Sequence, residues 1–199
     1  MILQSILNSV VVKMSDIDYE VKQFKKTLTT KEFFENFNNF DLVQGYCKEC
    51  PRYDTNYSCS PLDIDIKKFI LEYEYIDIFV TQLFFEPEQY EKDYSPDELS
   101  KFLYDTFYKE KKKINNKVLE SEKDYSKAIS ITGPCNHCAK NCKEWYDECL
   151  HPEIRRYSLA SLGMDSKKIL KDLFDIDLLL INGVLPKYLN SITSLLYKK

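Results

Sequence analysis

Seven cysteines fall into two groups, and the rest of the chain has none. The first group, in CKECPRYDTNYSC, consists of Cys47, Cys50 and Cys59. The second group, in CNHCAKNCKEWYDEC, consists of Cys135, Cys138, Cys142 and Cys149. Two cysteines with two residues between them can direct both sulfurs at one metal, because the intervening turn folds back on itself. Since each group has such a pair with further cysteines nearby, the spacing predicts that all seven thiolates bind metal.

The number of thiolates favours an iron–sulfur cluster over zinc. A structural zinc ion takes four ligands, so Cys47, Cys50, Cys135 and Cys138 could bind one ion and leave three cysteines without a role. A 4Fe-4S cluster can take four ligands from one loop, and the second group, followed by Pro152, resembles a ferredoxin loop with wider gaps. We therefore predict one or two 4Fe-4S clusters, one of them bound by the second group, with zinc as the alternative.

Other residues near the second group could support a bound metal. His137 and His151 are the only histidines, and a histidine beside a cysteine ligand is more often a hydrogen-bond donor or exposed than a ligand. Arg155 and Arg156 could donate hydrogen bonds to cluster sulfurs or to an anionic ligand, but an exposed turn is the favoured interpretation. Trp145 and its neighbour Tyr146 are expected to shield the site or to fill the core.

The two groups differ in their number of thiolates. If each group binds its own cluster, the first leaves one iron without a cysteine, and that iron must take water, another side chain or an external ligand. An open position is typical of catalytic metal sites, so the first group is a candidate for substrate binding. The favoured alternatives are one shared site, or closure of the gap by His137, His151 or an acidic residue such as Asp54.

The sequence resembles a family of small cysteine-rich proteins of unknown function that are described as predicted metal-binding and are common in anaerobic bacteria and archaea. The likeness lies in CKECPRYDTNYSCSP and GPCNHCAKNCKEWYDECLHPEIRRYSLASLGMD, and it covers most of the chain from about residue 30 onward. The resemblance implies that the seven cysteines are metal ligands, but it supplies no reaction. One difference is that Ser60 and Pro61 follow Cys59 where the family pattern is expected to have two prolines.

Composition excludes several classes of protein. With 199 residues, 44% of them hydrophobic, the chain can form one domain with a core that needs no disulfides. We therefore expect reduced thiols and a cytoplasmic protein. With 28 basic and 32 acidic residues, the chain lacks the excess of positive charge that is typical of nucleic-acid-binding proteins. The basic run KEKKK at 109–113 is expected to be a solvated helix face. No apolar run is long enough to cross a membrane, and the N-terminal stretch lacks the marks of a signal peptide.

The elements that must position the cysteines alternate between helix and strand. Helices are expected near residues 29–40, 63–73 and 95–120, the first and third with capping boxes at Thr29 and Ser95. Two short helices are expected at 158–174. Strands are expected at 75–85, buried on both faces, at 127–132, and at an edge near the C-terminus. This order predicts an α/β (α+β) fold: a single domain over residues 1–199 with a mixed β-sheet layered with helices, and with 1–18 loosely attached.

The sequence says less about the function of the protein than about its fold. With four glycines there is no phosphate-binding loop, and G-x-S-x-G is absent, so the sequence leaves open whether the protein is an enzyme. We expect an iron–sulfur protein that transfers electrons, with a redox partner protein but no nucleic acid or membrane. The alternatives are a zinc-stabilised interaction domain and a thiol redox protein that uses Cys47 and Cys50. The last is disfavoured because Pro51 follows the pair directly.

Overall fold

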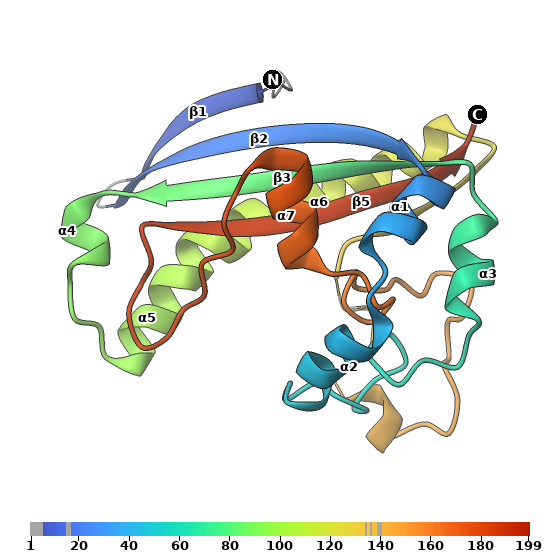
Figure 1. Ribbon diagram of the computed structural model, residues 1–199. Helices are drawn as coiled ribbons and strands as arrows, with labels where there is room; N and C mark the ends of the chain where they lie inside the picture. The colour runs from blue at the N-terminus through green and yellow to red at the C-terminus, as the bar shows by residue number, and fades with distance from the viewer. Residues whose placement is uncertain (1–5, 15–16, 134, 136, 139–140) are drawn as a thin grey trace.

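A five-stranded sheet forms the centre of the computed structural model, which describes residues 6–14, 17–133, 135, 137–138 and 141–199 (Figure 1). The strands, in the spatial order β1-β2-β3-β5-β4, are β1 (Ile6–Met14), β2 (Ile17–Thr29), β3 (Tyr75–Phe85), β4 (Lys127–Ile131) and β5 (Tyr188–Lys198). Each neighbouring pair of these strands is antiparallel. The predicted single α+β domain with helices layered on a sheet is confirmed, but the sheet is antiparallel, not mixed. The order of elements along a chain does not by itself set strand direction.

The N-terminal segment supplies two strands that the sequence pattern did not reveal. β2 pairs with β3 along its whole length, from Tyr19 opposite Phe85 to Thr29 opposite Tyr75. Its several charged residues interrupt the apolar pattern by which a strand is recognised in a sequence. One of these charges has a structural role, because Lys25 Nζ lies 2.6 Å from the carboxylate of the buried Asp77 in β3.

Strand β3 is buried on both faces, as predicted. Its residues Ile76, Ile78 and Val80 pack in one hydrophobic core, whereas Leu83 and Phe85 belong to a second. The first core lies under α1 (Thr30–Phe37), α3 (Ile66–Leu71) and α7 (Ser166–Phe174). The opposite face is covered by α5 (Pro96–Leu103), a π-helical turn (Tyr104–Tyr108) and α6 (Lys109–Glu120), and α4 (Pro87–Tyr90) follows β3 (Figure 1).

The helix starts read from the sequence are confirmed. The Thr29 hydroxyl accepts a hydrogen bond from Glu32 N, and the Glu32 carboxylate accepts one from Thr29 N. Ser95 and Glu98 make the same reciprocal pair at the start of α5. Each box satisfies two amide groups that a helix start leaves without a partner.

Three elements differ from the prediction. The first helix ends at Phe37, and Phe40 begins a separate helix, α2 (Phe40–Lys48), where its side chain is 46% exposed and not in the core. Residues 159–163 form turns, because Ser158 and Ser161 hydrogen-bond each other and Gly163 has a φ of 72°. Strand β5 lies inside the sheet because β4 pairs along its outer side.

The cysteines lie outside the sheet, in what we call the cysteine lobe, residues 49–65 and 132–165. Figure 1 shows both segments on the same side of the molecule, beside α2 and α3. Cys47, at the end of α2, borders the lobe. Among the described residues, no helix combines the length and apolar character that crossing a membrane requires.

Candidate metal centre

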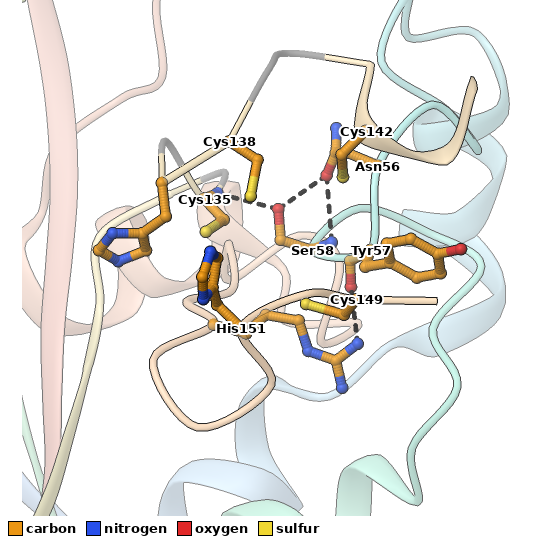
Figure 2. Close-up of a pocket in the computed structure, with 10 residues that line it drawn as sticks. Asn56, Tyr57, Ser58, Cys135, Cys138, Cys142, Cys149 and His151 are labelled. Carbon is orange, nitrogen blue, oxygen red and sulfur yellow. Dashed lines mark hydrogen bonds between the residues drawn. The ribbon is translucent and has the colours of Figure 1, made fainter. Parts of the chain in front are cut away.

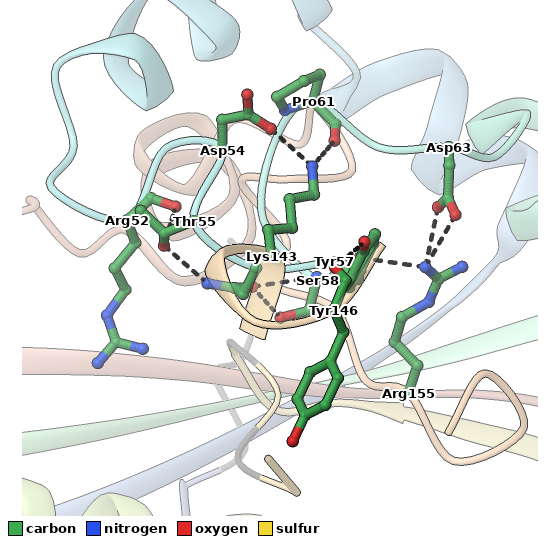
Figure 3. Close-up of polar contacts among 11 residues, drawn as sticks. Arg52, Asp54, Thr55, Tyr57, Ser58, Pro61, Asp63, Lys143, Tyr146 and Arg155 are labelled. Atoms are coloured by element: carbon green, nitrogen blue, oxygen red, sulfur yellow. Dashed lines mark hydrogen bonds and ion pairs between the residues drawn. The ribbon is translucent and has the colours of Figure 1, made fainter. Parts of the chain in front are cut away.

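Several polar contacts join the two segments of the cysteine lobe (Figure 3). Lys143 donates its backbone N–H to Thr55 O at 3.1 Å, and its ammonium lies 2.7 Å from Asp54 Oδ1. Tyr57 donates its hydroxyl to Tyr146 O at 2.7 Å. Because the contacts link residues about ninety positions apart, they bring the two cysteine groups into one region. They also occupy Asp54, which the sequence had suggested as a ligand.

A further contact between the segments positions the start of the second cysteine group. Cys135 N donates to the hydroxyl of Ser58 at 2.9 Å, and that hydroxyl donates to Asn56 Oδ1 at 2.7 Å. Asn56 also accepts from Ser58 N at 3.1 Å. Both residues are buried, so this short network fixes the backbone of Cys135 against the loop of the first group.

The second cysteine group lines one pocket. Its walls are formed by Asn56, Tyr57, Ser58, Cys135, His137, Cys138, Cys142, Cys149, His151 and Arg155. Figure 2 shows the sulfurs of Cys135 and Cys138 and the ring of His151 turned toward the same space, with Cys142 and Cys149 farther along the Asn56–Ser58 side. All four thiols are free and partly buried. The structure thus gathers the four residues that the spacing had grouped, and it adds both histidines.

Electrostatics in the pocket favour a cation. Burial raises the pKa of the Cys138 thiol, and the negative charges that Cys142, Cys135 and Cys149 would carry raise it further. In the absence of a cation, this shift favours the neutral form of the Cys138 thiol. A metal ion reverses this balance because it stabilises the deprotonated sulfurs that bind it.

Arg155 supplies a donor to the same pocket. Its side chain is only 8% exposed, and its guanidinium pairs with Asp63 at 2.9 Å and donates to Tyr57 O at 3.3 Å. Its Nε is buried and has no hydrogen-bond partner among the described atoms. A buried donor without an acceptor is costly, and a sulfur in the pocket would satisfy it. Arg156 instead binds Glu122, at 2.7 Å, outside the pocket. The exposed-turn interpretation is wrong for both arginines.

The first cysteine group lies close to the Asn56–Ser58 wall of the pocket but does not line it. Cys47 lies in the last turn of α2, its thiol lies 3.8 Å from Ala160 O, and its carbonyl accepts from Cys50 N at 3.0 Å. Cys59 N donates to Asn56 O at 3.3 Å. Burial raises the pKa of the Cys59 thiol, and the charges of Cys50 and Cys47 contribute in the same direction. Cys59 also immediately follows the Asn56–Ser58 wall of the pocket.

The side chains do not adopt a closed ligand shell. Across the described part of the chain, no three His, Cys, Asp or Glu side chains are arranged as ligands of one metal ion. The pocket residues nevertheless suit a soft metal or cluster, because they combine four thiols with a buried donor that has no acceptor. Sequence reasoning missed Asn56 and Ser58. Their position just before Cys59 was the one available signal. Trp145 is 73% exposed and fills no core.

The chain belongs to a family described as predicted metal-binding protein (DUF2284), whose model matches residues 16–194. The family resemblance read from the cysteine segments is confirmed, and the match begins before residue 30. It includes β2 and both cysteine groups. No curated protein and no solved structure is significantly similar to the chain.

Proposed function

We propose that this family member binds a 4Fe-4S cluster through the second cysteine group and uses it for electron transfer or another redox reaction. The observation that carries the proposal is that four thiols from one short segment, Cys135 to Cys149, line a single pocket. A cubane cluster takes four thiolates and can take them all from one loop. The cluster would supply one-electron chemistry, and the chain's own residues would set its environment.

Arg155 fits this role through its position in the wall of the pocket. Its unpartnered Nε–H can donate to a cluster or cysteine sulfur, and such hydrogen bonds favour the reduced, more negative state of a cluster. Asp63 and Tyr57 O hold the other end of the guanidinium, so its orientation is fixed before any metal binds. Ser58 fixes the backbone of Cys135 in the same way.

The first cysteine group extends the proposal. Cys47, Cys50 and Cys59 supply three thiolates, so a second cluster there would have one iron open to another ligand. Cys50 is exposed, which would give a redox partner protein access to this group. We further propose a cytoplasmic location, since thiols that bind a cluster must stay reduced, as they do in the cytoplasm.

Zinc is the second candidate. His137 and His151 both line the pocket with the four cysteines, and zinc sites with mixed cysteine and histidine ligands are common. A single zinc ion would hold the lobe closed without redox chemistry, as in a zinc-stabilised interaction domain.

Metal analysis of protein purified without oxygen separates the two candidates. We expect iron and acid-labile sulfide, a brown colour, and loss of both in Cys142→Ser. Cys50→Ser, which removes an exposed thiol from the first group, serves as the control and is expected to keep the cluster of the second group. Colourless protein with stoichiometric zinc and no sulfide after attempted cluster reconstitution would refute the iron–sulfur proposal and support zinc.

A further inference from the structure

Residues 144–154, a segment of the cysteine lobe, present large apolar side chains to solvent. Trp145, the only tryptophan of the chain, is exposed. The other exposed apolar side chains of this segment are Tyr146, Leu150 and Ile154. Large apolar side chains that are exposed close together often mark a binding surface, and tryptophan and tyrosine are enriched in protein–protein interfaces.

The same segment carries the excess negative charge of the protein. It contains four carboxylates and no lysine or arginine, so its formal charge of −4 equals the net charge of the whole chain. The rest of the chain therefore has no net charge. The carboxylates are exposed, and none forms an ion pair with a described residue; they are those of Glu144, Asp147, Glu148 and Glu153.

Backbone hydrogen bonds join this surface to the pocket of the second cysteine group. Cys142 O accepts from Trp145 N at 3.2 Å and from Tyr146 N at 3.0 Å. Cys149 lies within the segment, and both cysteines line the pocket. Figure 1 shows the turn Cys142–Glu144 at the edge of the molecule, away from the sheet. A protein that docked on residues 144–154 would therefore contact the neighbours of two proposed metal ligands.

We propose that residues 144–154 form the docking surface for a redox partner protein that presents a basic patch around an apolar centre. The redox role of the partner rests on the proposed function, whereas the surface itself rests on exposure and charge. An acidic surface attracts a basic partner and orients it during the encounter. Trp145 and Tyr146 supply the apolar contact area once the partner has docked.

Charge and size both favour such a partner over a second copy of the chain. In a symmetric dimer formed through this surface, each copy would present its four carboxylates to those of the other, and like charges in an interface are costly. Permanent dimers also bury larger and more apolar interfaces, whereas electron-transfer complexes bury small ones. A single short segment suits the second kind of complex.

Calorimetric titration with cytochrome c, a basic electron carrier, tests the charge of the surface. Its haem is supplied in the reduced state, so that it cannot accept an electron during the titration. We expect protein purified without oxygen to bind it at low ionic strength and to lose most of this affinity as salt screens the attraction. Asp147→Lys should bind at least about tenfold more weakly than the parent. Asp93→Lys, the same change at an exposed residue between α4 and α5, should bind within about twofold of the parent.

A second pair of variants tests the apolar contact. Trp145 and Tyr104 are matched in exposure, at 73% and 72%, but only Trp145 lies in the proposed surface. Trp145→Ala should bind cytochrome c at least about fivefold more weakly than the parent, whereas Tyr104→Ala should bind as the parent does. Because both side chains are exposed, neither substitution should change the melting temperature.

Three results would overturn the docking surface. They are no binding of cytochrome c by the parent, equal binding by each variant and its control, and a parent dimer that Trp145→Ala dissociates, as measured by light scattering. Metal analysis of the same samples separates this outcome from that of the proposed function. Binding by colourless zinc protein would leave the surface in place and refute the redox role, whereas brown iron–sulfur protein that does not bind would refute the surface alone.

Discussion

Replacing Gly163 by alanine tests how the cysteine lobe is attached to the helices. Gly163 has a φ of 72°, and an added Cβ would lie 2.9 Å from Cδ2 and 3.2 Å from Cα of Phe40, and 3.0 Å from Nδ2 of Asn38. The side chains could move, but the Cα of Phe40 could not without shifting the start of α2. The same junction includes the hydrogen bond from Asn39 N to Gly163 O at 2.9 Å.

Two costs add up at this position. An alanine in the left-handed region costs about 1–2 kcal/mol, and overpacking a tight contact costs about 1–3 kcal/mol. We therefore expect Gly163→Ala to lower the free energy of unfolding by at least about 2 kcal/mol. In a domain of this size, this corresponds to a loss of roughly 4 °C or more in melting temperature.

Two other glycines serve as controls. Gly183 has a φ of 73° and nothing within 4 Å of an added Cβ, so Gly183→Ala should show the conformational cost alone. Gly45 lies within α2 with the same open space, so Gly45→Ala should stabilise the protein by up to about 1 kcal/mol. Urea unfolding followed by circular dichroism gives the three free energies. If Gly163→Ala is as stable as Gly183→Ala, the close contact with Phe40 has no energetic consequence and the reasoning fails.

Three further predictions concern the metal centre and the sheet. Cys138→Ser should reduce both metal content and melting temperature, because metal bound only by the native loops adds its binding energy to folding; an unchanged melting temperature in a metal-free variant would show that the site is peripheral to the fold. Ser58→Ala leaves the Cys135 N–H without its acceptor and should cost about 1–3 kcal/mol in urea unfolding, with Ser60→Ala, whose hydroxyl has no partner among the described atoms, as the milder control. Burial raises the pKa of the Tyr19 phenol, and the hydrogen bond and charge of Glu110 raise it further. The neutral phenol therefore stabilises the folded state fully below the unfolded-state pKa of about 10. This contribution to stability is lost as the pH rises further. Tyr19→Phe should therefore show a weaker fall in stability between about pH 9 and 11, and an identical fall in parent and variant would contradict the assignment.

Local signals in the sequence were sufficient for part of the fold. The capping boxes at Thr29 and Ser95 and the strand 75–85 were predicted correctly, because caps and strongly apolar strands depend on residues close together in the chain. Strand β2 was missed because its charges are satisfied by distant partners such as Asp77. A contact between residues 52 positions apart leaves no periodic pattern in the sequence.

In the candidate metal centre, too, some features follow from nearby residues in the sequence and others only from the tertiary structure. Spacing alone separated the four-cysteine and three-cysteine groups, because cysteines a few residues apart can share a metal whatever the rest of the chain does. Only the tertiary structure decided that Arg155 lines the pocket while the adjacent Arg156 binds Glu122. In the basic run at 109–113, it likewise decided that Lys111 is partly buried beside Gly133 while the adjacent Lys112 is exposed. Neighbouring side chains of one type differ in role because the direction of each is set by packing against segments that are remote in the sequence.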